Sequence, residues 1–467
     1  MKIRHVILTI VSILLCLTFL AIIFPKNGIS IGSLHLTFPS LREVFFNSTP
    51  EYANIDNIVQ QTNVVDNKNN KEQSSIQKDI VTFLYPNGDS TLLYSFFRHL
   101  EKSKQNKVRM LHYGDSQIEG DRITSYIRTR LQESFGGVGQ GEIPLFSLSN
   151  IQGVTYKYSN NWHHKSILNK RERTFNNFGI MMTCCIPYTE MVVDSTNMDT
   201  TYIQSAWIEL NFSQPVSNNL HLYCSSPKTS SKINISSKGT TLVKQNINQS
   251  ENLVDILIPI SQPIHSLRIE TTGTIQLYSI DNSSDNGVYV DNISLRGSSG
   301  WGINYNNPEL ITKMADLLDV KLIIMQFGVN AIPQEEDKVM ESYDFFRKEY
   351  SRQLAFLKKA IPDAEIIVIG ASDRSRKKGS GYETNPNIPK LIQAQKQAAE
   401  ENDCIFWNLF EAMGGNNSMP SWVLREEPLA NPDFIHFNSK GAKHVAEMFY
   451  QALDVEYQKY LLFKQQR

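Results

Sequence analysis

The stretch KVRMLHYGDSQIEGDRITSYIRTRL, residues 107–131, holds the pattern that decides the fold. Residues 107–113 form a short, largely apolar run that is typical of a buried strand. Apolar residues then recur at helical spacing from Ile118 to Leu131, as on one face of an amphipathic helix. A strand that leads directly into such a helix is the repeating unit of a parallel sheet covered by helices on both faces.

The same alternation returns in the last third of the chain. Strand-like runs occupy residues 320–327, 364–371 and 404–410, and helical patterns occupy residues 340–361, 388–402 and 439–454. Near-continuous apolar strands between amphipathic helices indicate a doubly wound α/β domain with three layers and a flavodoxin-like parallel sheet. We expect this domain in two parts, residues 81–148 and 291–467.

Residues 149–290 have a different character. Their strands are short, alternate between apolar and polar residues, and are separated by Asn, Gly, Ser and Pro turns. This pattern predicts an antiparallel β-sandwich inserted into the α/β domain. Trp162 and Trp207 are candidates for stacking on sugar rings, although Trp207 alternates like a residue of the sandwich core, and we favour the core for it.

The N-terminus predicts a membrane anchor. Lys2 and Arg4 precede an uncharged apolar run, and about 20 helical residues span a bilayer. The run exceeds the core of a cleavable signal, and no small-x-small site follows it. We therefore expect an uncleaved signal-anchor over residues 1–25 that crosses the cytoplasmic (inner) membrane through residues 5–24 and leaves the rest periplasmic or extracellular. A cleaved signal peptide, the alternative, would export the same domain.

Composition limits the remaining segments and partners. Residues 26–80 read as a stem and linker, and the polar stretch 48–80 predicts a flexible tether. The chain has 46 Lys and Arg against 47 Asp and Glu, so it has no excess of positive charge with which to bind nucleic acid. In an exported chain Cys224 could form a disulfide with Cys184 or Cys185, and the cysteine spacing fits no zinc site.

The tripeptide Gly-Asp-Ser occurs twice. The first copy follows a Pro-Asn turn and precedes a helix, so Ser90 is expected to cap that helix. The second copy ends the strand of residues 107–113, at the edge of the sheet where ligands bind in parallel α/β folds. A helix N-terminus close behind it would favour developing negative charge. Ser116 is therefore the candidate nucleophile.

Other candidate site residues follow other strands. Gly300 lies in GSSGWG, Asn330 lies in GVNA, and Asp433 and His436 are three residues apart before the last helix. Each has a plainer explanation, since such glycines are mostly turns, Asn can close a loop, and Asp-x-x-His pairs are common on surfaces. Their shared place at strand ends is what points to one site.

These residues together resemble the SGNH (GDSL-type) hydrolase family over residues 81–148 and 290–455. Gly114, Asp115 and Ser116 match the first block, although Gln117 replaces the usual Leu. Gly300 best matches the second-block glycine, with Gly297 as the alternative.

The third and fifth blocks complete the resemblance. Gly328 and Asn330 match the third block, where Ala331 replaces an Asp, and Asp433 with His436 matches the fifth. The interrupted domain resembles bacterial peptidoglycan O-acetylesterases, in which a carbohydrate-binding-like module splits an SGNH domain and that Asp also tends to be missing.

The resemblance implies a serine esterase that removes O-acetyl groups from peptidoglycan or another envelope polysaccharide without a metal or cofactor. Ser116 would be the nucleophile, His436 the base and Asp433 its orienting partner. The N–H groups of Ser116 and Gly300 and the Asn330 side chain would form the oxyanion hole. Trp301, beside that glycine, is placed to touch substrate or to pack.

Two other functions stay open at this point. The same triad can serve an O-acetyltransferase, for which the anchor would suit a partner membrane-bound acyltransferase. The chain could also be an inactive polysaccharide-binding protein. Ala331 is the only sequence support for this last reading, and the intact Asp433 and His436 pair argues against it.

Overall fold

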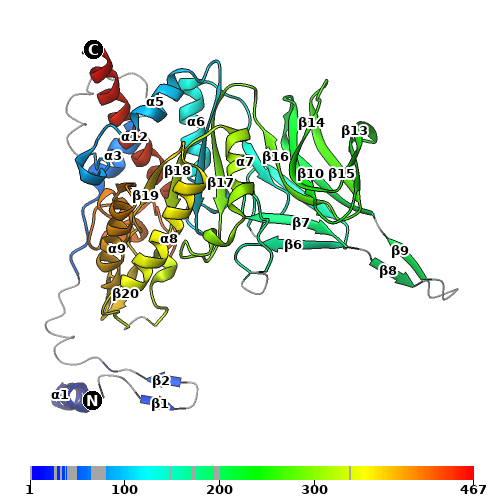
Figure 1. Cartoon of the computed structure of the whole chain (residues 1–467). Coiled ribbons are helices and arrows are strands. Elements are labelled where there is room, and N and C mark those ends of the chain that lie inside the picture. The colour runs from blue at the N-terminus through cyan, green and yellow to red at the C-terminus, as the bar shows by residue number, and fades with distance from the viewer. Residues whose placement is uncertain are drawn as a thin grey trace.

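A computed structural model describes most of the chain in two adjoining bodies, a helix-covered sheet and a set of antiparallel sheets (Figure 1). The described residues are 3–25, 29–31, 34–36, 38, 50–64, 80–147, 149–169, 174–188, 190–193, 200–203, 205–335 and 338–466.

The first body is built on a five-stranded parallel sheet. Its strands in spatial order are β17 (Gly287–Ser294), β3 (Lys107–Gly114), β18 (Val320–Gln326), β19 (Glu365–Ile369) and β22 (Ile405–Trp407). Numbered along the chain, this order is 2-1-3-4-5, the flavodoxin-like arrangement. The predicted three-layer α/β fold is therefore confirmed.

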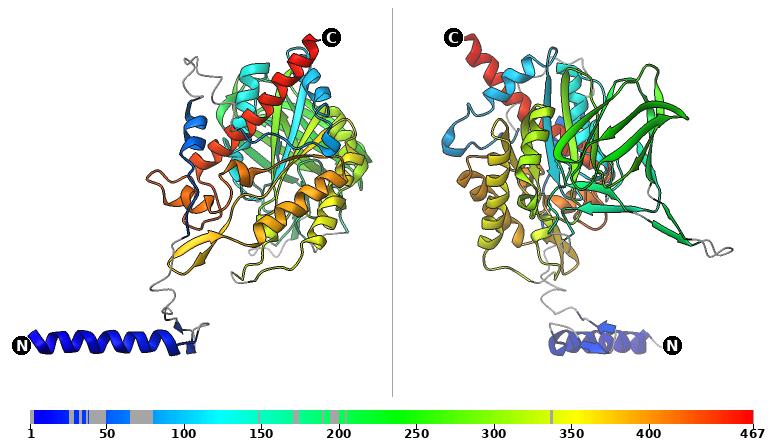
Figure 2. Two further views of the ribbon diagram at one scale, coloured as in Figure 1. Left: turned by 90° about the vertical axis from the view of Figure 1, so that its left-hand side faces the viewer. Right: turned by 45° about the vertical axis from the view of Figure 1, so that its right-hand side comes forward.

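Alternating side chains of each strand supply two separate apolar cores. On β3, Leu111 and Tyr113 face one core, whereas Val108 and Met110 face the other. The first core is covered by helices α7 (Pro308–Leu318), α8 (Asp344–Ala360) and α9 (Asn387–Glu401). The second is covered by helices α5 (Tyr94–Glu101), α6 (Thr124–Phe135), α11 (Ser418–Leu424) and α12 (Ser439–Gln465). The long α12, red in Figure 2, runs obliquely across its face of the sheet.

The second body is the predicted antiparallel sandwich. One sheet has the order β13 (Thr240–Ile247), β12 (Ser231–Ser237), β15 (Ile264–Thr272), β10 (Ser205–Val216), β5 (Val154–Tyr158). The other has the order β14 (Ser250–Ile258), β11 (Leu220–Ser226), β16 (Gln276–Asn282), β7 (Thr183–Pro187), β6 (Trp162–Ser166), with β4 (Gly141–Pro144) also paired to β16. Their inner faces enclose a third apolar core.

Small elements complete the description. The two-stranded sheets pair β1 (Ile29–Ile31) with β2 (Leu34–Leu36), β8 (Glu190–Val193) with β9 (Thr200–Ile203), and β20 (Ser375–Lys378) with β21 (Gly381–Thr384). The remaining short helices are η2 (Pro86–Gly88), η3 (Glu119–Asp121), η5 (Ile303–Tyr305), η6 (Val329–Ala331) and α10 (Leu409–Ala412).

A buried ion cluster joins the two bodies. Arg109 on β3 is fully buried, and its guanidinium lies 2.9 Å from Asp291 on β17 and 2.9 Å from Asp281 on β16. Asp291 also accepts a hydrogen bond from the Glu142 N–H on β4 at 3.0 Å. Charges so far from water need partners. Here strand β16 of the sandwich supplies one of these partners, Asp281, and strand β4 holds the other, Asp291, through the Glu142 N–H.

The N-terminal helix α1 (Ile3–Ile23) has the length and composition of a membrane span. Its apolar stretch Arg4–Ile23 has a mean hydropathy of 3.0, and only 6% of it is buried in the protein. These properties fit an anchor and a signal sequence equally well.

The predicted tether is wrong over part of its length. Residues 65–79 lie outside the described residues, but helix α3 (Asp56–Val64) is ordered and packs on α12. Ile55, Val59 and Thr62 are buried at helical spacing. The polar average composition of the segment hid this short apolar stripe.

Trp207 is not in the sandwich core, contrary to our expectation. Ala206, Ile208 and Leu210 on β10 are fully buried, so Trp207 between them points to the outer face. Trp162, by contrast, is a core residue that is 6% exposed, and its ring N–H donates to the Trp207 carbonyl at 3.1 Å.

The structure also differs from the sequence at two further points. Ser90 does not cap a helix: Asp89 accepts the Thr91 N–H at 2.9 Å, and α5 begins only at Tyr94. Cys184, Cys185 and Cys224 are buried free thiols, so none of the disulfides left open by the sequence is present among them.

Candidate active site

The predicted site residues gather where the strand order reverses. Ser116 follows β3, and Asn330 follows the neighbouring strand β18, which is the switch point of a 2-1-3-4-5 sheet. The turn after β17 adjoins them, because the Leu295 N–H donates to the Gly114 carbonyl at 2.7 Å. The loop with Gly300 continues from that turn.

Ser116, His436 and Asp433 form one chain of hydrogen bonds. Ser116 Oγ lies 2.9 Å from His436 Nε2, and His436 Nδ1 lies 2.8 Å from Asp433 Oδ2. Ser116 is 8% exposed, whereas the His436 side chain keeps 34% of its surface accessible. A nucleophile, a base and an orienting group within hydrogen-bond reach are the geometry that nucleophilic catalysis requires.

The local fold holds the imidazole and its carboxylate together. Asp433 Oδ1 accepts the backbone N–H groups of Ile435 at 2.9 Å and His436 at 3.0 Å. Partial burial would raise the pKa of the Asp433 carboxyl, but the hydrogen bonds from His436 and Ile435 outweigh it and keep that pKa below its usual value. Phe434 adopts a positive φ of 57° and stacks on Tyr382 with the ring centroids 3.6 Å apart. The carboxylate is thus ready to stabilise a charged imidazole.

Gln117 and Arg122 tie the serine turn to the histidine loop. The Gln117 amide donates to the Ile435 carbonyl at 2.8 Å, and the Arg122 guanidinium donates to the Ser116 carbonyl at 2.7 Å and to the Phe437 carbonyl at 2.8 Å. Sequence reasoning missed both roles. The departure at Gln117 from the family pattern was the one signal, because a Leu could make none of these bonds.

The helix after Ser116 begins later than predicted. A turn and the short helix η3 intervene, with Gly120 at φ 70° and Asp121 at φ 62°, and α6 starts only at Thr124. Ser116 is therefore not at the N-terminus of an α-helix, and helix-dipole stabilisation of the oxyanion does not apply. The apolar residues Ile118 and Ile123 are buried as expected, although both lie outside α6.

The expected oxyanion donors are held by hydrogen bonds of their own loops. The Asn330 amide donates to Asp115 Oδ2 at 3.2 Å and to the Ser298 carbonyl at 3.0 Å. The Gly300 N–H donates to Ser298 Oγ at 3.0 Å. Ser298, which sequence reasoning missed, thus contacts both. In this arrangement a substrate oxyanion would have to replace one of these acceptors.

Gly300 is constrained in a way that Gly297 is not. Both have positive φ, 85° and 78°, but a Cβ on Gly300 would lie 2.7 Å from a ring carbon of Tyr350, while one on Gly297 would meet open space. Only glycine fits at Gly300 for both reasons.

Ala331 and Arg374 help to hold the loop of the third block, which contains Gly328 and Asn330. Ala331, in place of the family Asp, packs against the first core. Arg374 donates to the Val329 carbonyl at 3.2 Å and so supports the loop from another strand end.

Asp115 is an unusual neighbour of this site. Its side chain is 1% exposed and accepts the Gln117 N–H at 2.9 Å in addition to the Asn330 amide. Burial raises the pKa of Asp115 to about 7, against these hydrogen bonds, which favour its charged form. The group that orients Asn330 therefore changes its charge near neutral pH.

A hollow of about 410 Å³ lies beside the serine turn. Glu119 and Arg296, an ion pair at 3.2 Å, line it, as do Tyr156 and Tyr158 of the sandwich. The two tyrosine rings are parallel, with centroids 5.8 Å apart. Trp301, beside Gly300, is 37% exposed and packs edge-on against Phe345.

Within the described residues, no three His, Cys, Asp or Glu side chains lie close enough together to hold an ion.

Comparison with known proteins agrees with this geometry. Residues 260–449 match the model of the GDSL-like lipase/acylhydrolase family, a range that includes Gly300, Asn330, Asp433 and His436 but not Ser116. A solved peptidoglycan O-acetylesterase aligns with a TM-score of 0.62 at 18% identity, over 80% of this chain and 99% of its own. The chain carries an SGNH hydrolase domain of the GDSL type.

This SGNH domain is an esterase domain by its family match, as the sequence predicted. Two further solved structures are less similar. A family two carbohydrate esterase from Cellvibrio japonicus has 9% identity over 65% of this chain and 100% of its own, with a TM-score of 0.24. An acetyl xylan esterase has 17% identity over 36% and 81%, with a TM-score of 0.26. No curated protein matches the chain.

Proposed function

We propose that the SGNH domain hydrolyses acetyl esters through Ser116, His436 and Asp433. The observation that supports this most is the unbroken set of hydrogen bonds from Ser116 Oγ through His436 to Asp433 at the switch point.

The reaction proceeds in two balanced steps. Ser116 Oγ forms a bond to the acyl carbon as its proton moves to His436 Nε2, and the alcohol oxygen then leaves with that proton. Water next attacks the acyl-enzyme and gives a proton to His436. The bond from Ser116 Oγ to the acyl carbon then breaks, His436 returns the proton to Ser116 Oγ, and the acid is released as acetate. Asp433 stabilises the imidazolium in both steps.

The oxyanion is held by the N–H groups of Ser116 and Gly300 and by the Asn330 amide. Donors of this kind each contribute about 2.7–4 kcal/mol to lowering the barrier. Ser298 releases the Gly300 N–H or the Asn330 amide when the oxyanion forms, since it accepts from both in the structure.

The proposed substrate is an O-acetylated envelope polysaccharide, with peptidoglycan first. Support comes from the peptidoglycan O-acetylesterase that shares the fold over 80% of this chain, a share too large for the two α/β segments alone. The hollow beside Glu119 and Arg296 would receive the sugar that carries the ester. Its paired tyrosine rings offer apolar faces to sugar rings.

The proposed location follows from α1. As a signal-anchor it would hold the esterase at the inner membrane with the catalytic domain in the periplasm or outside the cell, where envelope polysaccharide lies.

The test is acetate release from O-acetylated peptidoglycan by the full chain in detergent. Ser116→Ala and His436→Ala should each lower the rate by at least about 10³-fold. Ser90→Ala is the matched control, because it changes the other Gly-Asp-Ser copy and should leave the rate unchanged. If all three variants lost the same share of the rate of acetate release, or if none lost any, the assignment of Ser116 and His436 as catalytic residues would be refuted.

The same preparation decides between hydrolysis and transfer. If an added glycan acceptor gains acetyl groups from a soluble donor faster than acetate appears, the domain is an O-acetyltransferase. Glycan binding with neither product would identify an inactive binding protein.

A further inference from the structure

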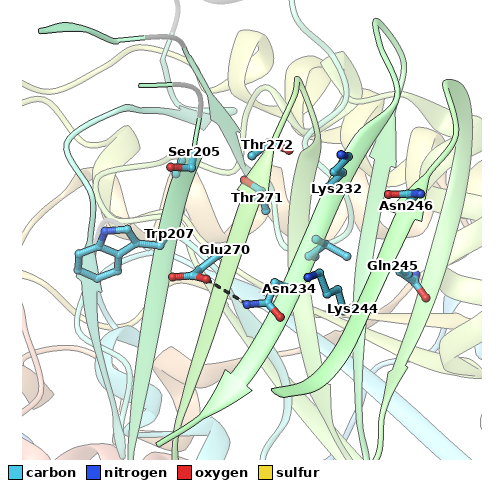
Figure 3. Close-up of a pocket in the computed structure, with 12 residues that line it drawn as sticks. Ser205, Trp207, Lys232, Asn234, Lys244, Gln245, Asn246, Glu270, Thr271 and Thr272 are labelled. Atoms are coloured by element: carbon cyan, nitrogen blue, oxygen red, sulfur yellow. Dashed lines mark hydrogen bonds between the residues drawn. The ribbon is translucent and has the colours of Figure 1, made fainter. Parts of the chain in front are cut away.

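The outer face of one sandwich sheet carries a hollow that the proposed active site does not use. It has a volume of about 470 Å³ and lies over strands β10, β15, β12 and β13 (Figure 3). Its lining is mostly polar side chains around one indole. None of its lining residues belongs to the loops that carry Ser116 or His436.

The register of the sheet arranges these side chains in two rows. Trp207 lies opposite Glu270, Glu270 opposite Asn234, and Asn234 opposite Lys244. The next row outward runs through the following residues: Ser205, Thr272, Lys232, Asn246. Because side chains alternate along a strand, both rows project from the same face. They form a continuous track across four strands rather than a single polar spot.

The Trp207 ring is held in place by charged neighbours. The Arg268 guanidinium lies 4.0 Å from the ring centroid, and Arg268 is itself paired with Glu270 at 2.9 Å and with Glu209 at 3.8 Å. Leaving part of a tryptophan exposed forgoes the free energy of burying it. A ring that is partly exposed but immobilised is what a stacking platform for a flat apolar face needs.

Asn234 leaves an acceptor unused in this hollow. Its amide N–H donates to Glu270 Oε2 at 3.1 Å, a bond drawn in Figure 3, while its Oδ1 is buried and has no partner among the described residues. Buried acceptors are rarely left unpaired, because an acceptor that has lost its water and gained no other partner destabilises the fold. A hydroxyl group of a ligand would satisfy it.

The charge of the track is positive at its far side. Lys232 and Lys244 are exposed, and neither forms an ion pair within the described part of the chain. Glu270 is already neutralised by Arg268. Two unpaired ammonium groups, two and three strands away from the indole, together with the free amide oxygen, complement a ligand that combines hydroxyl groups, an apolar ring face and carboxylates.

We propose that this track binds a strand of a carboxylate-bearing glycan, with one sugar ring against Trp207, a hydroxyl group at Asn234 and a carboxylate at Lys232 and Lys244. The inference rests on the proposed function for its choice of a polysaccharide. It adds a second contact with the polymer, remote from the reacting ester, that raises the local concentration of substrate at the active site.

Binding is measured separately from catalysis. The full chain in detergent, carrying Ser116→Ala, is mixed with insoluble peptidoglycan, and the bound fraction is read by sedimentation. Adding Trp207→Ala should weaken binding about tenfold or more, and adding Lys232→Gln with Lys244→Gln about threefold, with a smaller dependence on salt. Lys228→Gln, an exposed lysine outside the hollow, is the matched control and should change nothing. Trp207→Phe should retain most of the binding.

A neutral probe tests the part of the proposal that concerns charge. Soluble chitooligosaccharides present uncharged N-acetylated sugars, so they should bind more weakly and be indifferent to the two lysine substitutions. Equal affinity for both probes would overturn the assignment of a carboxylate-bearing ligand. Unchanged peptidoglycan binding by a folded Trp207→Ala protein, with its melting temperature as the check, would overturn the site itself.

Hydrolysis of p-nitrophenyl acetate by the chain with Ser116 intact separates this inference from the proposed function. The small ester cannot reach both sites, so Trp207→Ala should leave its kcat/KM unchanged and lower only the rate on polymer. An inactive chain that still binds peptidoglycan through Trp207 would refute the esterase and keep the track. An active chain whose peptidoglycan binding ignores Trp207 would do the reverse.

Discussion

Gln117 shows how one residue can depart from a family pattern and still serve the site. Its amide joins the serine turn to the Ile435 carbonyl, and its Oε1 lies within 3.4 Å of the Phe437 N–H. The distance from Ser116 to His436 therefore depends on a side chain that does not touch the reacting atoms. We regard Gln117 as a positioning residue.

Gln117→Leu, which restores the usual family residue, should lower kcat by about 10–100-fold with little change in KM, because misplacing a base by about 1 Å can cost 10²-fold. Steady-state kinetics on p-nitrophenyl acetate measure both constants. Gln105→Leu, on an exposed turn, is the control. A rise in KM alone would mean that Gln117 contacts substrate instead.

Asp115 makes stability depend on pH with a predictable sign. Its folded-state pKa is raised by burial to about 7, above the usual value near ~4, so the folded state retains a proton that the unfolded chain has lost. The free energy of unfolding should therefore fall as pH rises from about 4 to about 7.

Asp115→Asn removes this titration. The free energy of unfolding of the variant minus that of the parent should rise steadily from pH 4 to pH 7 and then stay level. The altered hydrogen bonds would shift this whole curve up or down without changing its shape. Urea denaturation at several pH values gives the difference curve. A flat difference would show that Asp115 keeps an ordinary pKa.

At the scale of elements, the two glycines Gly297 and Gly300 in the loop after β17 should differ in how well they tolerate substitution by alanine. Gly300→Ala places a Cβ against Tyr350 in a left-handed conformation, whereas Gly297→Ala has the same backbone strain without the clash. We expect Gly300→Ala to destroy activity and Gly297→Ala to cost only about 1 kcal/mol of stability. Comparing acetate release with melting temperature separates the two effects. The opposite result would assign the oxyanion role to Gly297.

The strands were predictable because buried parallel strands are apolar throughout, as residues 320–327 show. The residue at which α6 begins was not predictable, because Ile118 and Ile123 keep helical spacing although Gly120 and Asp121 turn the chain between them. The side of Trp207 could have been read from the alternation of Ile208 with Leu210. The bonds of Arg122 to two carbonyls far apart in the chain leave no trace in local pattern.

For the site, the sequence predicted the meeting of Ser116, Asp433 and His436, although only Ser116 directly follows a strand and the other two lie in the loop between α11 and α12. It did not predict Ser298 or Arg374, which act through hydrogen bonds to the backbone of neighbouring loops. Side chains with such roles have no fixed spacing from the residues they support.

At the scale of the whole molecule, Arg109 should be one of the most sensitive positions. Arg109→Met leaves Asp291 buried without its cation and leaves Asp281 with only Lys107, 3.6 Å away, and breaking a buried pair in this way costs about 3–5 kcal/mol. Urea denaturation should show that loss. Combining Arg109→Met with Asp281→Asn and Asp291→Asn should restore much of it, and a failure to do so would mean that packing of the arginine stem matters more than its charge.

The cluster around Arg109 has a consequence for protein engineering. Strands β16 and β17 adjoin in sequence, and each contributes one of the two carboxylates around the same guanidinium. A gene shortened by residues 149–290 would therefore not encode a minimal esterase, because it would remove Asp281 from a cation that no water reaches. Chimeras that exchange sandwiches between related enzymes would have to carry the arginine and both aspartates across the splice together.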